Sequence, residues 1–259
     1  MPSPSVYFIG AGPGDPELLT IKAQRLIREA DLILYAGSLV PRDVLTWAKK
    51  DSEIMDSSGM TLKQTHAALV QAAGRGQTAA RVHTGDPSLY GAIMEQMRLL
   101  EQDKIAYEVV PGITAAFAAA AKAAVSFTVP EHTQTLIFTR MSGRTPVPEK
   151  ERLRDLAAHK CSLAIYLSTS LVQDMVQELQ AGGLPDSTLV CVGSRIGWPG
   201  EDLLWTDLGH LEEQVQRTGL TRQAVFLVLP DQERQQTPES RLYSSDFSHG
   251  FRQAGEYRP

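Results

Sequence analysis

Short apolar runs alternate with amphipathic segments along the first half of the chain. Five runs have the length of buried strands, at residues 6–10, 32–35, 53–55, 78–84 and 107–110. Longer segments repeat apolar positions with helical spacing, at residues 20–30, 61–74, 88–102 and 114–124. Parallel strands need a crossover, which such helices provide, so this order predicts a mostly parallel sheet wrapped by helices.

A second pattern begins after an extended connection that contains Pro130. Strand-like runs follow at residues 135–139, 162–167, 189–192, 203–206 and 224–229. Helical segments lie at residues 149–159, 171–181 and 208–217. The last three strand-like runs are closely spaced, which predicts a mixed sheet with hairpins. We therefore expect an α/β protein with two domains, residues 1–127 and 128–231, and a C-terminal extension, residues 232–259.

Composition and charge restrict the class of protein. Of 259 residues, 42% are hydrophobic and 21% are charged, a balance that supports a folded core. The formal net charge is −5 and no basic stretch occurs, so nucleic acid is not an expected partner. The start of the chain lacks the pattern of a signal peptide, so we expect a cytoplasmic protein without a membrane partner. Cys161 and Cys191 lack metal-ligand spacing, so we expect buried free thiols and no metal site.

The first strand-like run leads into a glycine-rich loop, GAGPGD at residues 10–15. Its position between strand and helix is typical of a dinucleotide-binding turn, but its sixth residue is Asp15 instead of glycine or alanine. Pro13 also removes one backbone N–H, and no acidic residue ends the second strand. The loop therefore favours a turn that serves another ligand, and a dinucleotide-dependent oxidoreductase remains the alternative from another class.

Two further tight loops follow later strands, TGDPSLYG at residues 84–91 and VPGIT at residues 110–114. Ligands of open α/β sheets bind outside the carboxyl ends of strands, so three such loops predict a binding cleft there. Asp86 is open to two interpretations: it caps the following helix, or it orients substrate and assists proton loss. Asp86 is therefore the one candidate catalytic residue.

These three loops resemble those of the tetrapyrrole methylases, enzymes that methylate uroporphyrinogen and the precorrins with S-adenosyl-L-methionine. The resemblance covers essentially the whole chain. Within the family, the segments LYAGSLV, DSSGMTL, TRMSGRTPVPEKE and ESRLYSSDFSHGFR resemble the methylases that act at C-11 of precorrin-4 or cobalt-precorrin-4. Another precorrin methylase acting at a different ring carbon, and a tetrapyrrole carrier without turnover, remain alternatives.

The resemblance implies two α/β domains with S-adenosyl-L-methionine in the cleft between them, leaving as S-adenosyl-L-homocysteine. Trp198, Pro199 and Glu201 match the family's Trp-Pro-x-Glu loop, but residues 192–197 lack the tyrosine and the Ala-Ser pair expected before it. The implied cofactor-binding positions are Pro13, Thr84, Gly85, Asp86, Leu89, Thr114, Ala115, Leu167, Ile196 and Ala224.

A tetrapyrrole substrate with peripheral carboxylates requires local cations on this acidic protein. Arg140 and Arg144 are the expected substrate contacts, because their loop follows a strand end, and a solvated loop is the alternative. Arg81 and His83 are further candidates, although His83 in its apolar strand is equally consistent with a core histidine. The resemblance and the apolar residues of the C-terminal extension also predict a homodimer. Those residues are Leu242, Tyr243, Phe247 and Phe251.

Overall fold

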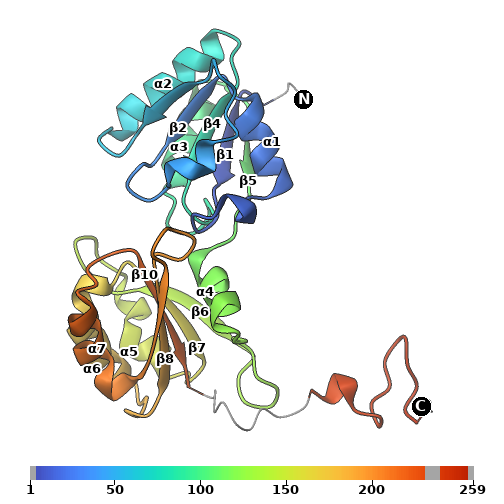
Figure 1. Ribbon diagram of the computed structural model, residues 1–259, viewed down its shortest axis with the longest axis vertical. Helices are drawn as coiled ribbons and strands as arrows, with labels where there is room; N and C mark the ends of the chain where they lie inside the picture. Colours follow the sequence, from blue (N-terminus) through green and yellow to red (C-terminus); the bar gives the residue numbers. More distant parts are fainter. Residues whose placement is uncertain (1–3, 231–239, 256–259) are drawn as a thin grey trace. The chain divides into compact units, whose positions relative to one another are not determined.

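The computed structural model describes residues 4–230 and 240–255 and divides the chain into two compact units (Figure 1). The first unit contains the described part of Met1–Ala119 and the later segment Arg195–Asp202. The second contains Ala120–Ser194 and the described residues from Leu203 onward. The predicted domain bounds, residues 127 and 231, differ from this division, because a pattern of apolar residues identifies each helix or strand but not the core in which it packs.

The first unit is built on a parallel sheet of five strands. The strands are β1 (Val6–Gly10), β2 (Leu32–Tyr35), β3 (Glu53–Asp56), β4 (Ala79–His83) and β5 (Tyr107–Val110). Their order in the sheet is β3-β2-β4-β1-β5, and the four strand pairs are all parallel. The predicted parallel sheet is therefore confirmed.

Helices cover both faces of this sheet (Figure 1). The helices are α1 (Ile21–Glu29), α2 (Leu62–Gly74) and α3 (Ile93–Gln102), with the short 3-10 helices η1 (Pro16–Leu18) and η2 (Arg42–Leu45). Ile9 of β1 packs in the cluster that contains Ile27 of α1. Its neighbour Phe8 packs in the opposite cluster, with Leu69 of α2 and Leu100 of α3. This alternation is what a strand buried on both faces requires.

The structure corrects the predicted start of one helix. We expected helix from residue 88, but α3 begins only at Ile93. Tyr90 and Ala92 have φ of 56° and 49°, in the left-handed region that interrupts a helix. Between them, a Cβ on Gly91 would lie 2.1 Å from the carbonyl oxygen of Pro87. The chain therefore makes a tight turn before α3.

The second unit contains a mixed sheet, as the spacing predicted. Its strands are β6 (Leu136–Arg140), β7 (Ser162–Tyr166), β8 (Leu189–Ser194), β9 (Asp202–Asp207) and β10 (Ala224–Leu229), in the order β6-β7-β10-β8-β9. β6 is parallel to β7, and β10 is antiparallel to β7 and β8. Of the last three strands, only β8 and β9 are neighbours in both the sequence and the sheet.

The helical elements after β5 are α4 (Ala115–Ala123), α5 (Leu153–Ala157), α6 (Val172–Ala181) and α7 (Leu211–Thr218), with η3 (Glu149–Glu151), η4 (Thr169–Leu171) and η5 (Leu208–His210). The single helix expected at residues 149–159 is divided into η3 and α5, because Arg152 has an extended ψ of 140°. Cys161 and Cys191 are buried free thiols, as predicted. Within residues 4–230 and 240–255, no helix is long and apolar enough to cross a membrane.

Part of the predicted C-terminal extension is described, from residue 240 to residue 255; residues 231–239 and 256–259 lie outside the described part. It contains one short helix, η6 (Arg241–Tyr243). The guanidinium of Arg252 donates to the carbonyl oxygens of Leu242, Ser244 and Phe247, at 2.6, 2.7 and 3.4 Å. The hydrogen bonds of this arginine therefore hold residues 242–252 together, a role that a hydrophobic core has in larger units.

Candidate active site

The three glycine loops follow β1, β4 and β5, which lie side by side in the parallel sheet (Figure 1). The carboxyl ends of parallel neighbours meet at one edge, so the loops lie together, as predicted. The backbone N–H of Gly85 donates to the carbonyl of Gly12 at 2.7 Å, and the N–H of Gly12 donates back to the carbonyl of Gly85 at 3.2 Å. Hydrogen bonds within the backbone therefore join the first loop to the second.

Glycine is required here because the loop backbones approach one another closely. A Cβ on Gly112 would lie 2.1 Å from the carbonyl oxygen of Gly85, and a Cβ on Gly10 would lie 2.6 Å from the Cα of Gly112. Gly85 itself has φ of 61°, which favours glycine for conformational reasons. The third loop is thus packed against both of the others without side chains between them.

Asp86 joins the second loop to the third. Its Oδ1 accepts from the backbone N–H of Ser88 at 2.8 Å, and its Oδ2 accepts from the N–H of Gly112 at 2.9 Å. Both carboxylate oxygens are therefore used by backbone donors. The first bond stabilises the turn before α3 and does not cap that helix, because α3 begins only at Ile93. This geometry favours a positioning role for Asp86 over that of a general base.

The segment that returns from the second unit packs on the first loop. A Cβ on Gly197 would lie 2.7 Å from the backbone nitrogen of Asp15, and a Cβ on Gly14 would lie 2.6 Å from Cδ1 of Trp198. Glu201 closes the segment, because its Oε2 accepts from the N–H of Gly197 at 3.0 Å. The resemblance identifies Trp198 and Glu201 but does not predict this packing, for which Gly14 and Gly197 are the signal in the sequence.

Each cofactor position implied by the resemblance has a defined place in one unit. The first unit holds Pro13, Thr84, Gly85, Asp86, Leu89, Thr114, Ala115 and Ile196, and the second holds Leu167 and Ala224. Within the first unit, a Cβ on Gly85 would lie 3.6 Å from the Cα of Thr114, so these two positions are neighbours. None of the ten carries a basic side chain, and most are small or apolar. Such residues fit a cationic sulfonium ligand with an adenine ring.

Non-glycine residues with left-handed backbone occur just beyond several strands. Leu167 directly follows β7, with φ of 54° and a side chain 63% exposed. Arg195 directly follows β8, with φ of 50°, and Tyr90 lies in the loop after β4. Each such conformation costs about 1 kcal/mol or more and persists where the surrounding structure imposes it, often near functional sites. Residue types alone gave no signal for these positions.

The structure corrects the interpretation of Arg81 as a substrate contact, and for His83 it favours the alternative of a core histidine. Arg81 is only 8% exposed and donates to Gln96, Ser57 and the carbonyl of Leu34 at 3.1, 2.9 and 3.2 Å. Burial lowers the pKa of Arg81 to about 10. His83 is 5% exposed, and burial, followed by the charge of Arg81, lowers its pKa to about 3. Both side chains lie on β4, whose residues are buried on both faces, so they belong to the core.

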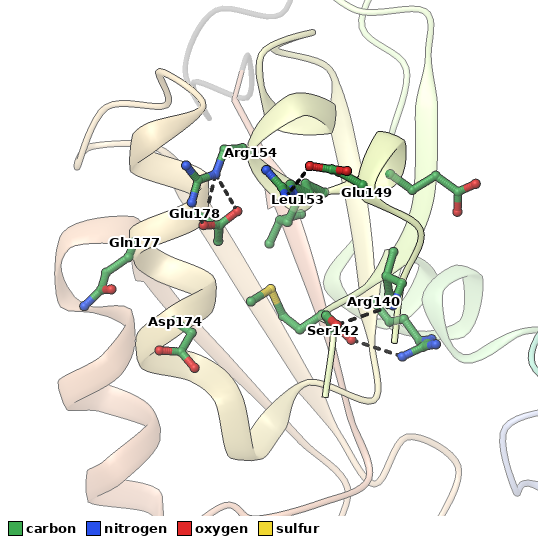
Figure 2. Close-up of a pocket in the computed structure, with 12 residues that line it drawn as sticks. Arg140, Ser142, Glu149, Leu153, Arg154, Asp174, Gln177 and Glu178 are labelled. Carbon is green, nitrogen blue, oxygen red and sulfur yellow. Dashed lines mark hydrogen bonds and ion pairs between the residues drawn. The ribbon is translucent and has the colours of Figure 1, made fainter. Parts of the chain in front are cut away.

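The second unit contains a pocket of about 550 Å³ beside the loop that carries Arg140 and Arg144 (Figure 2). Arg140 lines this pocket, but its guanidinium donates to the carbonyls of Met141, Thr145 and Pro146, at 3.2, 3.0 and 2.9 Å. Arg140 therefore shapes its own loop. Arg144 is exposed, and no ion pair to it is found among the described residues. Of the two predicted substrate contacts, Arg144 has the more available charge.

Comparisons with known proteins agree with this architecture. The pattern of the tetrapyrrole (corrin/porphyrin) methylases matches residues 5–212. The chain is 42% identical to the cobalt-precorrin-4 C(11)-methyltransferase of Priestia megaterium, over 95% of this chain and 97% of the relative. It is 44% identical to the precorrin-4 C(11)-methyltransferase of Pseudomonas aeruginosa, over 96% of this chain and 98% of the relative.

Solved structures show the same two-unit fold. An X-ray structure of a cobalt-precorrin-4 methyltransferase of cobalamin biosynthesis superposes with a TM-score of 0.84 at 43% identity, over 86% of this chain and 93% of that one. A uroporphyrin-III C-methyltransferase of Thermus thermophilus, complexed with S-adenosylhomocysteine, gives a TM-score of 0.72 at 26% identity, over 86% of this chain and 96% of that one. The family pattern and the nearly full-length relatives together establish that this chain belongs to the tetrapyrrole methylases.

Proposed function

We propose that this protein is an S-adenosyl-L-methionine-dependent methyltransferase that methylates C-11 of precorrin-4 or cobalt-precorrin-4 in cobalamin biosynthesis. The observation that carries the proposal is identity of 42% to 44% with enzymes of both names over 95% to 96% of this chain. Membership of the family also leaves the dinucleotide-dependent oxidoreductase without support, in agreement with the mismatched glycine loop.

The residues that would hold the methyl donor in the first unit are those of the glycine loops. Gly85 and Thr114 are neighbours, and because Gly85 has no side chain, its backbone groups can approach a ligand closely. Leu167 and Ala224, in the second unit, remain predictions from the resemblance. When bound, the donor supplies an electrophilic methyl group, so the protein has to provide orientation and exclusion of water without a nucleophile of its own.

Asp86 contributes to this orientation through the backbone. Because its two oxygens accept from Ser88 and Gly112, it fixes the second loop relative to the third. Arg144 is the proposed partner for a peripheral carboxylate of the substrate, since its charge is exposed. Arg140 would support the same contact by holding the backbone of residues 141–146.

The test is to incubate the protein with precorrin-4, with and without cobalt, and with a donor that carries a ¹³C-labelled methyl group. We expect the label at C-11, located by NMR. Label at another ring carbon would assign the protein to a different step, and binding of the tetrapyrrole without transfer would indicate a carrier. Comparing the two substrates identifies whether cobalt is present in the natural one.

We also propose that the protein acts as a homodimer. Apolar side chains are concentrated in the described part of the C-terminal extension, where Tyr243 is 79% exposed and Phe251 is 100% exposed. Leu242 and Phe247 are also exposed. A second copy of the chain would cover such residues, and two-fold dimers are the commonest soluble assembly.

A further inference from the structure

A second pocket, of about 420 Å³, lies entirely within the first unit. It opens where β2 and β3 end and where the segment Arg195–Asp202 returns. Its walls include the apolar or aromatic residues Tyr35, Val40, Pro41, Trp198 and Pro199. None of the cofactor positions implied by the resemblance lines it. The pocket therefore shares no lining residue with those positions, although its wall residue Trp198 packs on Gly14 of the first glycine loop.

Two guanidinium groups enter the lining of this pocket, from Arg42 and Arg195. Nε of Arg42 donates to the hydroxyl of buried Tyr35 at 3.4 Å, and this bond is the largest cause that raises the pKa of Arg42 above its usual value. No carboxylate lies within ion-pair distance of either arginine in the described chain. Both side chains thus keep N–H donors available for a ligand.

Two acidic residues, Asp43 and Asp56, also line the pocket and balance the two arginines in formal charge. Oδ1 of Asp56 accepts from the backbone N–H of Gly37 at 3.0 Å and from that of Ser58 at 2.8 Å. These hydrogen bonds, with the one to Ser58 the largest cause, hold the pKa of Asp56 below its usual value. Asp56 is thus an ionised group held by backbone donors, and its charge and that of Arg42 also stabilise each other without an ion pair. Asp43 is exposed and contributes negative charge at the rim.

The chemistry of the lining fits an anion on an apolar stem. Guanidinium groups bind carboxylates through paired N–H donors, and aromatic and proline faces accommodate methylene groups and flat rings. Tyr35, Gly37 and Val40 belong to the LYAGSLV segment, and Asp56 begins DSSGMTL. These two segments distinguished the precorrin-4 methylases from the rest of the family in the sequence analysis. A pocket lined by residues of these segments is therefore a candidate for contacts that are specific to the substrate.

We propose that this pocket binds a peripheral carboxylate side chain of the tetrapyrrole, with Arg42 as the principal contact, Arg195 as the second and Tyr35 as a positioning residue. The inference rests on the proposed function, because it takes the substrate from it. The donor also carries a carboxylate on an amino acid moiety. A carboxylate bound in this pocket could therefore belong to the tetrapyrrole or to the methyl donor, and the experiment has to distinguish these two ligands.

The experiment compares Arg42→Ala, Arg42→Lys and Tyr35→Phe with Arg28→Ala, which removes an exposed arginine of α1 that has no ion pair among the described residues. For each variant, equilibrium binding of precorrin-4 is followed by absorbance and binding of S-adenosylhomocysteine by calorimetry, with thermal unfolding as the control for folding. We expect Arg42→Ala to weaken precorrin-4 binding about five- to tenfold, Arg42→Lys and Tyr35→Phe to weaken it less, and Arg28→Ala to leave it unchanged. S-adenosylhomocysteine should bind equally to all of them.

Three results would overturn the proposal. If Arg42→Ala binds precorrin-4 as Arg28→Ala does, the pocket does not hold the carboxylate. If Arg42→Ala loses affinity for S-adenosylhomocysteine instead, the pocket serves the donor. If Arg42→Lys and Tyr35→Phe weaken precorrin-4 as much as Arg42→Ala while unfolding at lower temperature, the role is structural. Because these are binding measurements, they remain distinct from the methyl-transfer assay whose failure would reject the proposed function.

Discussion

Gly112 offers the sharpest test of the close approach between the three loops. In Gly112→Ala the added Cβ would lie 2.1 Å from the carbonyl oxygen of Gly85 and 2.8 Å from the backbone of Gly10. Backbone atoms on both sides cannot rotate away as a side chain can, so the third loop has to move by most of an ångström. The backbone of Gly112 is not left-handed, so the effect arises from space alone.

The magnitude follows from two contributions. Overpacking of this kind costs about 1–3 kcal/mol. Displacement of the third loop also lengthens the 2.9 Å hydrogen bond from Gly112 to Asp86, and a bond to a charged group contributes about 1.5–3 kcal/mol when fully formed. With partial loss of that bond, we expect the free energy of unfolding to fall by about 2–4 kcal/mol.

Urea unfolding measures this change, with a constant slope showing that the same cooperative transition is compared. Gly74→Ala is the matched control, because no atom lies within 4 Å of a Cβ at this helical position. That control should be neutral or stabilising by up to about 1 kcal/mol. A Gly112→Ala protein within about 0.5 kcal/mol of the wild type would refute the reasoning. Donor binding should weaken in Gly112→Ala and remain unchanged in Gly74→Ala.

Three further predictions concern charge and assembly. Arg144→Ala should lower affinity for precorrin-4 by about tenfold to a hundredfold if substrate shields the ion pair from water, and only severalfold if the pair stays exposed; equal loss of donor affinity would point to a structural role. His83 has a folded pKa of about 3, below the unfolded value of about 6.5, so the unfolded state binds more protons between these limits and stability falls as pH decreases through that window. His83→Leu should reduce the difference in unfolding free energy between about pH 7.5 and about pH 5.5, and an unchanged difference in urea unfolding would contradict the assignment. Light scattering should give about twice the monomer mass of 28.3 kDa, and the double substitution Tyr243→Ser, Phe251→Ser should shift it toward the monomer; a monomeric wild type would exclude the homodimer.

Strand positions in this protein could be predicted well from the sequence. The bounds of β2, β5 and β10 coincide with their predicted runs. β2 and β10 are apolar throughout and almost entirely buried, and the edge strand β5, which contains Glu108, is followed by the turn-forming residues Pro111 and Gly112. The three glycine loops were also located correctly, since each follows such a run. Local composition therefore contains the information that places the candidate site at the strand ends.

Long-range packing could not be predicted in the same way. Charged residues are normally exposed, so the sequence predicts that Arg81 is an available cation. Three polar acceptors compensate its burial instead, and all three, on Leu34, Ser57 and Gln96, lie 15 to 47 residues away in the sequence. The delayed start of α3 depends on left-handed residues that have no sequence signature, Tyr90 and Ala92. Residues 195–202 join the first unit through contacts with Gly14 and Asp15. These contacts link positions about 180 residues apart, so the sequence around either position does not predict them.

That return also sets an order of events during synthesis. All strands of the first sheet leave the ribosome before residues 195–202 are made, so the surface of the first loop around Gly14 stays uncovered for several seconds at ordinary rates of translation. Only when Trp198 emerges does the first unit acquire its last piece. The two units are consequently not separable by a single cut in the gene, and a fragment ending at residue 119 would lack a wall of the very pocket that we assign to the substrate.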